Sequence, residues 1–86
     1  MYKYRFTKQV EKFLLNQDKK FLLKFYEKIK ILIDNPIDNN LDIKSLRWLD
    51  NNYRLRIWKF RFLYAINNNE FYIYFYKWWS RWKIYK

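Results

Sequence analysis

The sequence predicts an α+β fold, in which an N-terminal strand and a helical hairpin pack on an antiparallel β-sheet in the order β-α-α-β-β-β. Three observations predict it: a short alternating run at the N-terminus, an apolar stripe at helical spacing in the first half, and three β-rich runs in the second half. The chain has 86 residues, of which 51% are hydrophobic and 26% aromatic. We therefore expect one domain over 1–86 with a packed core.

The first half contains one short strand and two helices. Residues 2–6 alternate at period two, as a strand does. Thr7 and Asp18 suit the N-caps of two successive helices. The second helix has an i, i+4 apolar stripe that stops before Pro36. We interpret its lysines as a solvated face, and they are Lys19, Lys20, Lys24, Lys28 and Lys30.

The second half reads as a sheet. Polar residues over 35–45 predict a connecting loop. Three β-rich runs follow, over 53–57, 60–66 and 70–76. The segments between them, 58–59 and 67–69, have the length of hairpin turns.

The composition excludes several classes of chemistry. Histidine, cysteine and glycine are absent, which removes disulfides, Cys/His zinc sites, Ser-His-Asp triads and glycine-rich phosphate loops. The chain carries 19 Lys and Arg against 8 Asp and Glu, a net charge of +11. Because clustered cations release counterions when they neutralise phosphates, this balance favours a polyanionic partner, with nucleic acid ahead of an acidic protein or an anionic membrane.

Strand alternation determines which arginines can meet. In residues 53–57, Leu55 and Ile57 would point to the helices, and Arg54 and Arg56 would point away from them. Antiparallel pairing across 58–59 would bring Arg61 near both arginines. Like charges side by side are unfavourable unless an anion joins them. The three arginines therefore form either a solvated strand face or an anion-binding site, and their clustering favours the site.

The last ten residues interleave cations with indoles. RNA-binding surfaces use this mixture, because aromatic rings stack on bases while Lys and Arg hold phosphates. For Trp78 and Trp82 the alternative is packing against the helices.

Three motifs follow one another along the chain. They are Tyr53-Arg54-Leu55-Arg56, then Arg61-x-x-Tyr64, then Arg81-x-x-x-Tyr85, with Lys44 and Arg47 ahead of them. In a basic chain of this length and element order, the combination resembles the RelE/ParE superfamily of small bacterial toxins. The similarity spans nearly the whole chain, so the resemblance implies a single toxin domain over 1–86.

For the RelE-like branch, the resemblance implies the toxin of a type II toxin–antitoxin system. Such a toxin is a ribosome-dependent mRNA endonuclease, or mRNA interferase, which inhibits translation through attack of the 2′-hydroxyl on the adjacent phosphate. Matched residue by residue, Arg54 and Arg56 correspond to the basic pair that binds and orients the RNA backbone. We also expect Lys44, Arg47 and Lys83 to bind RNA.

The same match implies three catalytic residues. Arg61 corresponds to the arginine that stabilises the transition state, and Arg81 to the one near the leaving oxygen. Tyr85 corresponds to the C-terminal tyrosine that stacks on or activates the nucleotide.

Two positions depart from the family pattern. Trp58 stands where many members have glycine, so we expect a hairpin turn other than type I′. Trp79-Ser80 replaces a Gly-His pair, which leaves Tyr85, Lys83 or ribosomal RNA as the general base. Three other functions stay open: ParE-like inhibition of DNA gyrase, a catalytically inactive member, and a module that only binds single-stranded nucleic acid.

The resemblance also implies partners. We expect a cognate antitoxin with an acidic segment, bound in a toxin–antitoxin hetero-oligomer, together with the ribosome and mRNA. No membrane partner is expected, because the N-terminus is a charged alternating run and no window approaches the length of a membrane span, so the expected location is the cytoplasm. No metal or organic cofactor is expected, because the carboxylates show no ligand spacing.

Overall fold

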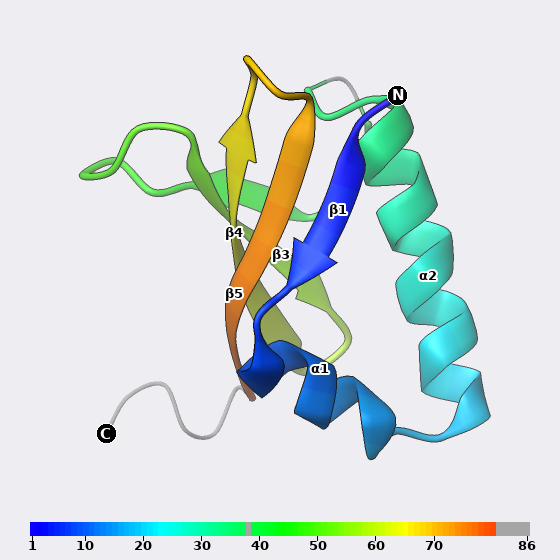
Figure 1. Ribbon diagram of the computed structural model, residues 1–86. Helices are drawn as coiled ribbons and strands as arrows, with labels where there is room; N and C mark the ends of the chain where they lie inside the picture. The colour runs from blue at the N-terminus through cyan, green and yellow to red at the C-terminus, as the bar shows by residue number, and fades with distance from the viewer. Residues whose placement is uncertain (38, 81–86) are drawn as a thin grey trace.

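The structure of the chain, a computed structural model, describes residues 1–37 and 39–80 (Figure 1). Along the chain its elements are β1 (Lys3–Phe6), α1 (Lys8–Leu15), α2 (Lys19–Asp34), β2 (Ile43–Ser45), β3 (Asn52–Ile57), β4 (Phe60–Asn67) and β5 (Tyr72–Ser80). The predicted α+β class is confirmed.

The five strands form one mixed sheet in the order β1-β5-β4-β3-β2. Strands β2 to β5 pair antiparallel, as predicted. Two details of the prediction were wrong. β1 adds parallel to β5, because the two helices carry the chain to β2 at the opposite edge, and it comes back beside β1 only with β5. Part of the expected loop forms β2, because Ile43 and Ser45 pair with Leu55 and Tyr53.

Both helices begin at the predicted caps. The Thr7 hydroxyl accepts a hydrogen bond from the Val10 amide at 3.3 Å, and the Asp18 carboxylate accepts one from the Phe21 amide at 2.9 Å. α2 ends at Asp34. The next residue, Asn35, precedes Pro36, and a residue before proline disfavours helical backbone. Neither of the described helices is long and apolar enough to cross a membrane.

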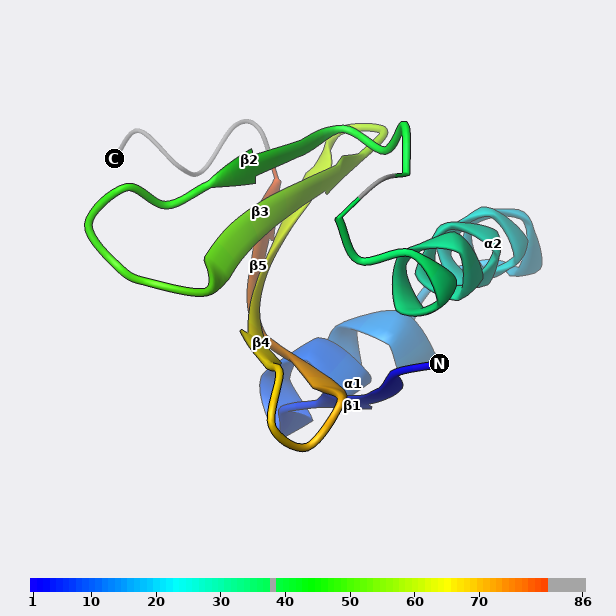
Figure 2. The same ribbon diagram turned by 90° about the horizontal axis from the view of Figure 1, so that it is seen from above.

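Both helices pack on the same face of the sheet, and no described helix or strand covers the opposite face (Figure 2). We call that opposite face the outer face. The core between helices and sheet is aromatic, and Phe13 of α1 and Phe25 of α2 both contact Phe62 of β4, with ring centroids 5.7 Å and 5.1 Å apart. The buried residues are Val10, Phe13, Leu14, Phe21, Phe25, Ile29, Leu32, Leu55, Ile57, Phe62, Tyr64, Ile66, Ile73 and Phe75.

A bulge interrupts the β4–β5 ladder. Leu63 pairs with Lys77, whereas its neighbour Tyr64 pairs with Phe75, so Tyr76 has no register partner on β4. The extra residue reverses the alternation along the rest of β5. Trp78 therefore turns inward against Phe13, with ring centroids 4.1 Å apart, which confirms the packing alternative for this tryptophan.

The β3–β4 hairpin turns through Trp58 and Lys59, between the paired residues Ile57 and Phe60. Trp58 has a φ of 56°, and Lys59 is not among the described residues with positive φ. A type I′ turn needs positive φ at both positions, so the expectation of another turn type is confirmed. The β4–β5 turn is longer than predicted and includes Glu70 and Phe71, because β5 begins only at Tyr72.

Tyr64 brings a polar atom into the core. Its side chain is fully buried, stacked on Tyr53 at 5.5 Å and next to Phe75 at 5.2 Å. Its hydroxyl has no hydrogen-bond partner within the described part of the chain. Burial, with a smaller contribution from Tyr53, raises the pKa of Tyr64 well above its ordinary value.

We expect Tyr64→Phe to raise the free energy of unfolding by about 1 kcal/mol, because it removes a buried hydroxyl that makes no hydrogen bond. Urea denaturation followed by circular dichroism measures this difference. Tyr74→Phe is the matched control, because Tyr74 is 37% exposed and its change should stay within about 0.5 kcal/mol. A loss of stability in Tyr64→Phe would show that a buried water serves this hydroxyl.

The same hydroxyl predicts a pH dependence. Because burial raises the pKa of Tyr64 in the folded chain, the unfolded chain releases this proton first as the pH rises past about 10. Its ionisation therefore favours unfolding above that pH, and stability falls there. We expect denaturation curves collected between about pH 9 and 11 to show a shallower fall for Tyr64→Phe than for the unmodified chain.

Candidate functional site

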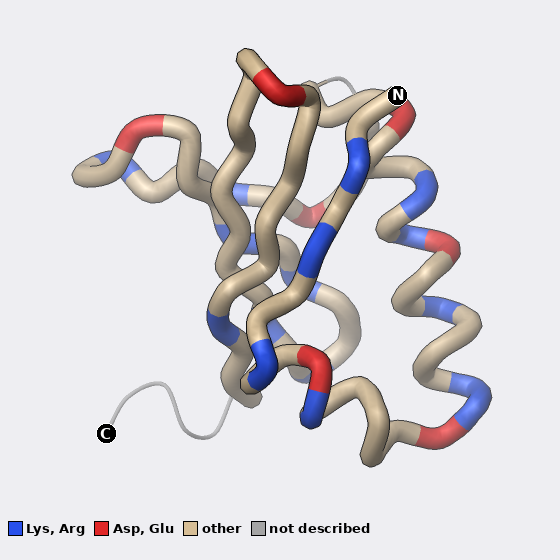
Figure 3. Tube along the Cα trace, in the orientation of Figure 1, with Lys and Arg blue, Asp and Glu red and all other residues tan. Residues whose placement is uncertain are grey.

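The strands of the sheet carry several Lys and Arg residues (Figure 3), and the strand register places them on the outer face. The strand register and the alternation of side chains show which residues of each strand point to the outer face. The residues on this side are Lys3, Arg5, Lys44, Asn52, Arg54, Arg56, Arg61, Leu63, Ala65, Tyr72, Tyr74, Lys77 and Trp79.

Three predicted site residues meet at the centre of this face. Arg56 of β3 lies directly opposite Arg61 of β4, and Arg54 lies opposite Leu63. Arg54 is therefore diagonal to Arg61, within reach of a long side chain. We call these three residues the arginine cluster. It has the arrangement that the sequence predicted.

A single carboxylate counters two of the three charges. Asp42 Oδ2 lies 2.6 Å from Arg56 Nε, and Asp42 Oδ1 lies 3.4 Å from an Arg54 terminal nitrogen. The Asp42 carbonyl also accepts a hydrogen bond from the Arg56 amide at 3.0 Å. Arg61 donates to the Lys59 carbonyl at 3.3 Å and has no carboxylate partner within the described residues.

The sequence reasoning missed Asp42. The sequence did carry a signal for it, because the apolar residues Leu41 and Ile43 flank Asp42 in the alternation that is typical of a strand. Asp42 would then face the same side as Arg56.

An indole borders the cluster. Trp79 of β5 pairs with Arg61, and the bulge at Tyr76 turns it outward. Within the described residues, the buried donors Trp79 Nε1 and Arg54 Nε have no hydrogen-bond partner. Both atoms are buried beneath the surface of the outer face.

The remaining predicted residues have three different positions. Lys44 of β2 pairs with Arg54 and extends the cluster toward the sheet edge. Arg47 is exposed in the loop between β2 and β3, which projects from the sheet (Figure 1), so the structure does not bring it into the cluster. Arg81, Lys83 and Tyr85 lie outside the described residues, as does Trp82.

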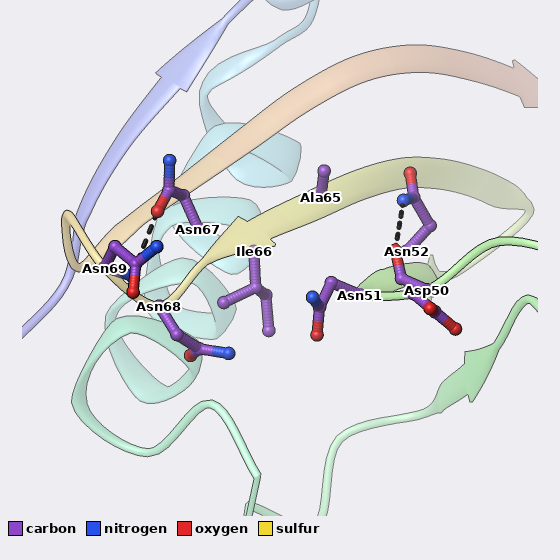
Figure 4. A pocket seen from close by; sticks show the side chains of 8 residues that line it. All are labelled: Asp50, Asn51, Asn52, Ala65, Ile66, Asn67, Asn68 and Asn69. Carbon is purple, nitrogen blue, oxygen red and sulfur yellow. Dashed lines mark hydrogen bonds between the residues drawn. The ribbon is translucent and has the colours of Figure 1, made fainter.

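An amide-lined hollow lies at the other end of β4 (Figure 4). It is lined by Asp50, Asn51, Asn52, Ala65, Ile66, Asn67, Asn68 and Asn69. Tyr76 donates to Asn52 Oδ1 at 2.7 Å, which connects the bulge to β3, and burial raises the pKa of Tyr76. No cation lines this hollow, so it lacks the groups that would hold a phosphate.

A second hollow lies between α2 and the sheet edge. Its lining includes Lys24 and Lys28 of α2, Asp42, Arg56 and Trp58. Lys24 and Lys28 are half-buried, whereas Lys19, Lys20 and Lys30 are exposed. The interpretation of these lysines as a solvated face stays a prediction for Lys24 and Lys28, because both line this hollow while the Lys24 side chain is still 41% exposed.

The fold is similar to those of known toxins. A chain of the archaeal RelE–RelB complex from Pyrococcus horikoshii OT3 matches with a TM-score of 0.82 and 27% identity, over 95% of this chain and 97% of that one. A chain of the RelB–RelE antitoxin–toxin complex from Methanococcus jannaschii matches with a TM-score of 0.72 and 23% identity, over 93% of each chain.

The isolated RelE toxin of E. coli matches with a TM-score of 0.76 and 12% identity, over 93% of this chain and 84% of that one. No protein-family model and no curated protein sequence matches the chain. The likeness in structure spans nearly every described element, and the resemblance to RelE-like toxins that the ordered arginine and tyrosine motifs indicated is thereby confirmed.

Proposed function

We propose that the chain is the toxin of a type II toxin–antitoxin system, and that it cleaves mRNA on the ribosome. The observation that carries the proposal is the arginine cluster. Arg56 and Arg61 lie directly opposite each other, on a face that no described helix or strand covers, in a fold similar to that of RelE.

The cluster suits the chemistry of phosphodiester cleavage. The 2′-hydroxyl loses its proton and attacks the adjacent phosphorus, the bond from phosphorus to the 5′-oxygen breaks, and that oxygen takes up a proton. Negative charge increases on the phosphoryl oxygens in the transition state. Arg61, which has no carboxylate partner within the described residues, is the cation we assign to that charge. Arg54 and Arg56 would hold the flanking backbone.

Proton transfer falls to the C-terminal residues in this proposal. With no histidine in the chain, we assign Tyr85 or Lys83, or ribosomal RNA, as the general base, and place Arg81 near the leaving oxygen. These roles rest on the sequence motif and on the need for an acceptor and a donor on opposite sides of the phosphorus.

An antitoxin is the second partner in the proposal. Two of the similar structures are RelE–RelB complexes. A net charge of +11 attracts an acidic segment, and Arg61 has no carboxylate partner within the described residues. An antitoxin segment that binds the cluster would exclude RNA from it.

Cleavage tests the proposal directly. We expect the purified chain to cut an mRNA held on ribosomes with an empty A site, and to leave the same mRNA intact in free solution. Primer extension maps the cuts. If neither sample is cleaved and the chain instead inhibits DNA supercoiling by gyrase, the chain is a gyrase inhibitor and not a nuclease.

We expect Arg61→Ala to lower the rate of cleavage at saturating ribosomes by about 10²–10³-fold, the typical effect of removing a group that stabilises transition-state charge. Arg5→Ala is the matched control, because Arg5 lies on the outer face two strands away. Its rate should stay within about twofold of the unmodified chain. Equal losses in the two variants would remove Arg61 from the catalytic residues.

We expect Asp42→Asn to tighten binding of a short single-stranded RNA about threefold. The Asp42 carboxylate competes with phosphate for Arg54 and Arg56, and the expected gain corresponds to the small energy of an exposed ion pair. Fluorescence anisotropy with a 2′-O-methylated, uncleavable RNA measures the dissociation constant. Weaker binding would instead mean that Asp42 acts by holding the two arginines in position.

A further inference from the structure

The hollow between α2 and β3 joins groups that lie far apart in the sequence. Lys24 and Lys28 stand one turn apart on α2. Arg56 comes from β3, and Trp58 from the turn that follows it. Figures 1 and 2 show that this turn lies on the α2 side of the sheet. The hollow is continuous with the arginine cluster through Arg56, which belongs to both.

The two lysines differ from the rest of the helix. Lys24 and Lys28 are half-buried on the flank that faces β3, and the other lysines of α2 are exposed. Lys24 contacts Glu27 at 3.3 Å, an exposed i, i+3 pair, whereas Lys28 has no ion-pair partner within the described residues. Lys28 therefore lines the hollow without a carboxylate partner among the described residues, and a bound anion would supply one.

Trp58 adds an aromatic ring to this cationic hollow. The indole is 51% exposed, and it contacts Phe21 edge-on at 5.5 Å and 69°. Trp58 has a φ of 56°, a conformation that is uncommon for a bulky residue. The turn therefore presents an exposed tryptophan at the hollow despite an unfavourable backbone.

We propose that this hollow is a second nucleotide-binding subsite, in which Lys24, Lys28 and Arg56 bind a phosphodiester of RNA and Trp58 stacks on the attached base. The proposal rests on the proposed function and extends the RNA path from the arginine cluster around the sheet edge to α2. A nucleotide uses both kinds of group at once, phosphate for the cations and base for the indole. An acidic peptide would leave the indole without a partner.

Asp42 also lines the hollow. Three cations and one carboxylate leave the lining with an excess of positive charge, so a phosphate is still attracted. Because Asp42 is bound to Arg56 through Nε, the terminal nitrogens of Arg56 are the ones that would contact the phosphate.

The test compares two double variants with the same change in charge. Lys24→Gln/Lys28→Gln removes the lysines of the hollow, and Lys19→Gln/Lys20→Gln removes two exposed lysines from the same helix. Binding of the uncleavable 2′-O-methylated RNA is measured by anisotropy at several salt concentrations. We expect the first variant to bind about tenfold more weakly at ~0.1 M salt, with a salt slope lower by about 0.7 for each phosphate no longer neutralised. The control should lose less than about threefold.

Trp58→Leu tests the stacking arm. It should weaken binding about tenfold and leave the salt slope unchanged, because stacking releases no counterions. Thermal melts by circular dichroism establish that each variant is folded at the temperature of the binding assay.

Three outcomes would overturn the subsite. Equal losses in the two lysine variants would reduce the lysines to a general charge effect, while ribosome-dependent cleavage by the unmodified chain would still support the proposed function. Loss of poly-glutamate binding in Lys24→Gln/Lys28→Gln, with RNA binding unchanged, would assign the hollow to an acidic protein segment. If the unmodified chain neither binds RNA nor cleaves mRNA on the ribosome, both the proposed function and the subsite are refuted.

Discussion

The packing of both helices on one face of the sheet determines where every candidate functional side chain lies. Side chains of a strand alternate between its two faces. Once Leu55, Ile57 and Phe62 are buried beneath α1 and α2, the arginines between them have only the outer face available. A guanidinium in this aromatic core would lose its hydration without gaining a partner, at a cost of several kcal/mol. The core therefore sorts the cations onto one surface, and the short β3–β4 turn sets Arg56 opposite Arg61.

The bulge at Tyr76 follows from the same core. Simple alternation from Ile73 and Phe75 would direct Lys77 and Trp79 inward and Trp78 outward. One extra residue on β5 exchanges these positions, so Trp78 packs on Phe13 and Lys77 reaches solvent. Burial of a lysine is avoided, and an indole fills the space beneath α1. The outer face gains Trp79 beside Arg61.

Local features of the structure could be predicted from the sequence, and features that depend on distant partners could not. The caps Thr7 and Asp18 and the pairing of Arg54 and Arg56 with β4 follow from residues a few positions apart. The parallel addition of β1 to β5, the strand β2 and the bulge each depend on elements distant in the chain. The same applies to Asp42 and to the two lysines of α2 that face β3. For Arg81, Lys83 and Tyr85, which lie outside the described residues, the roles stay predictions.

Asp42 lets the arginine cluster exist in the free chain. Arg54 and Arg56 on one strand repel each other, and a carboxylate between them offsets that repulsion. The Asp42 side chain is 39% exposed, and ion pairs of this kind contribute about 0–1 kcal/mol. Exchanging Asp42 for a phosphate as the partner of Arg54 and Arg56 therefore costs little free energy. A phosphodiester carries one negative charge over two non-bridging oxygens, and these can accept hydrogen bonds from Arg61 and from the terminal nitrogens of Arg54 and Arg56. The surface is thus stable without a ligand, and it has more donors than its own acidic residue can use.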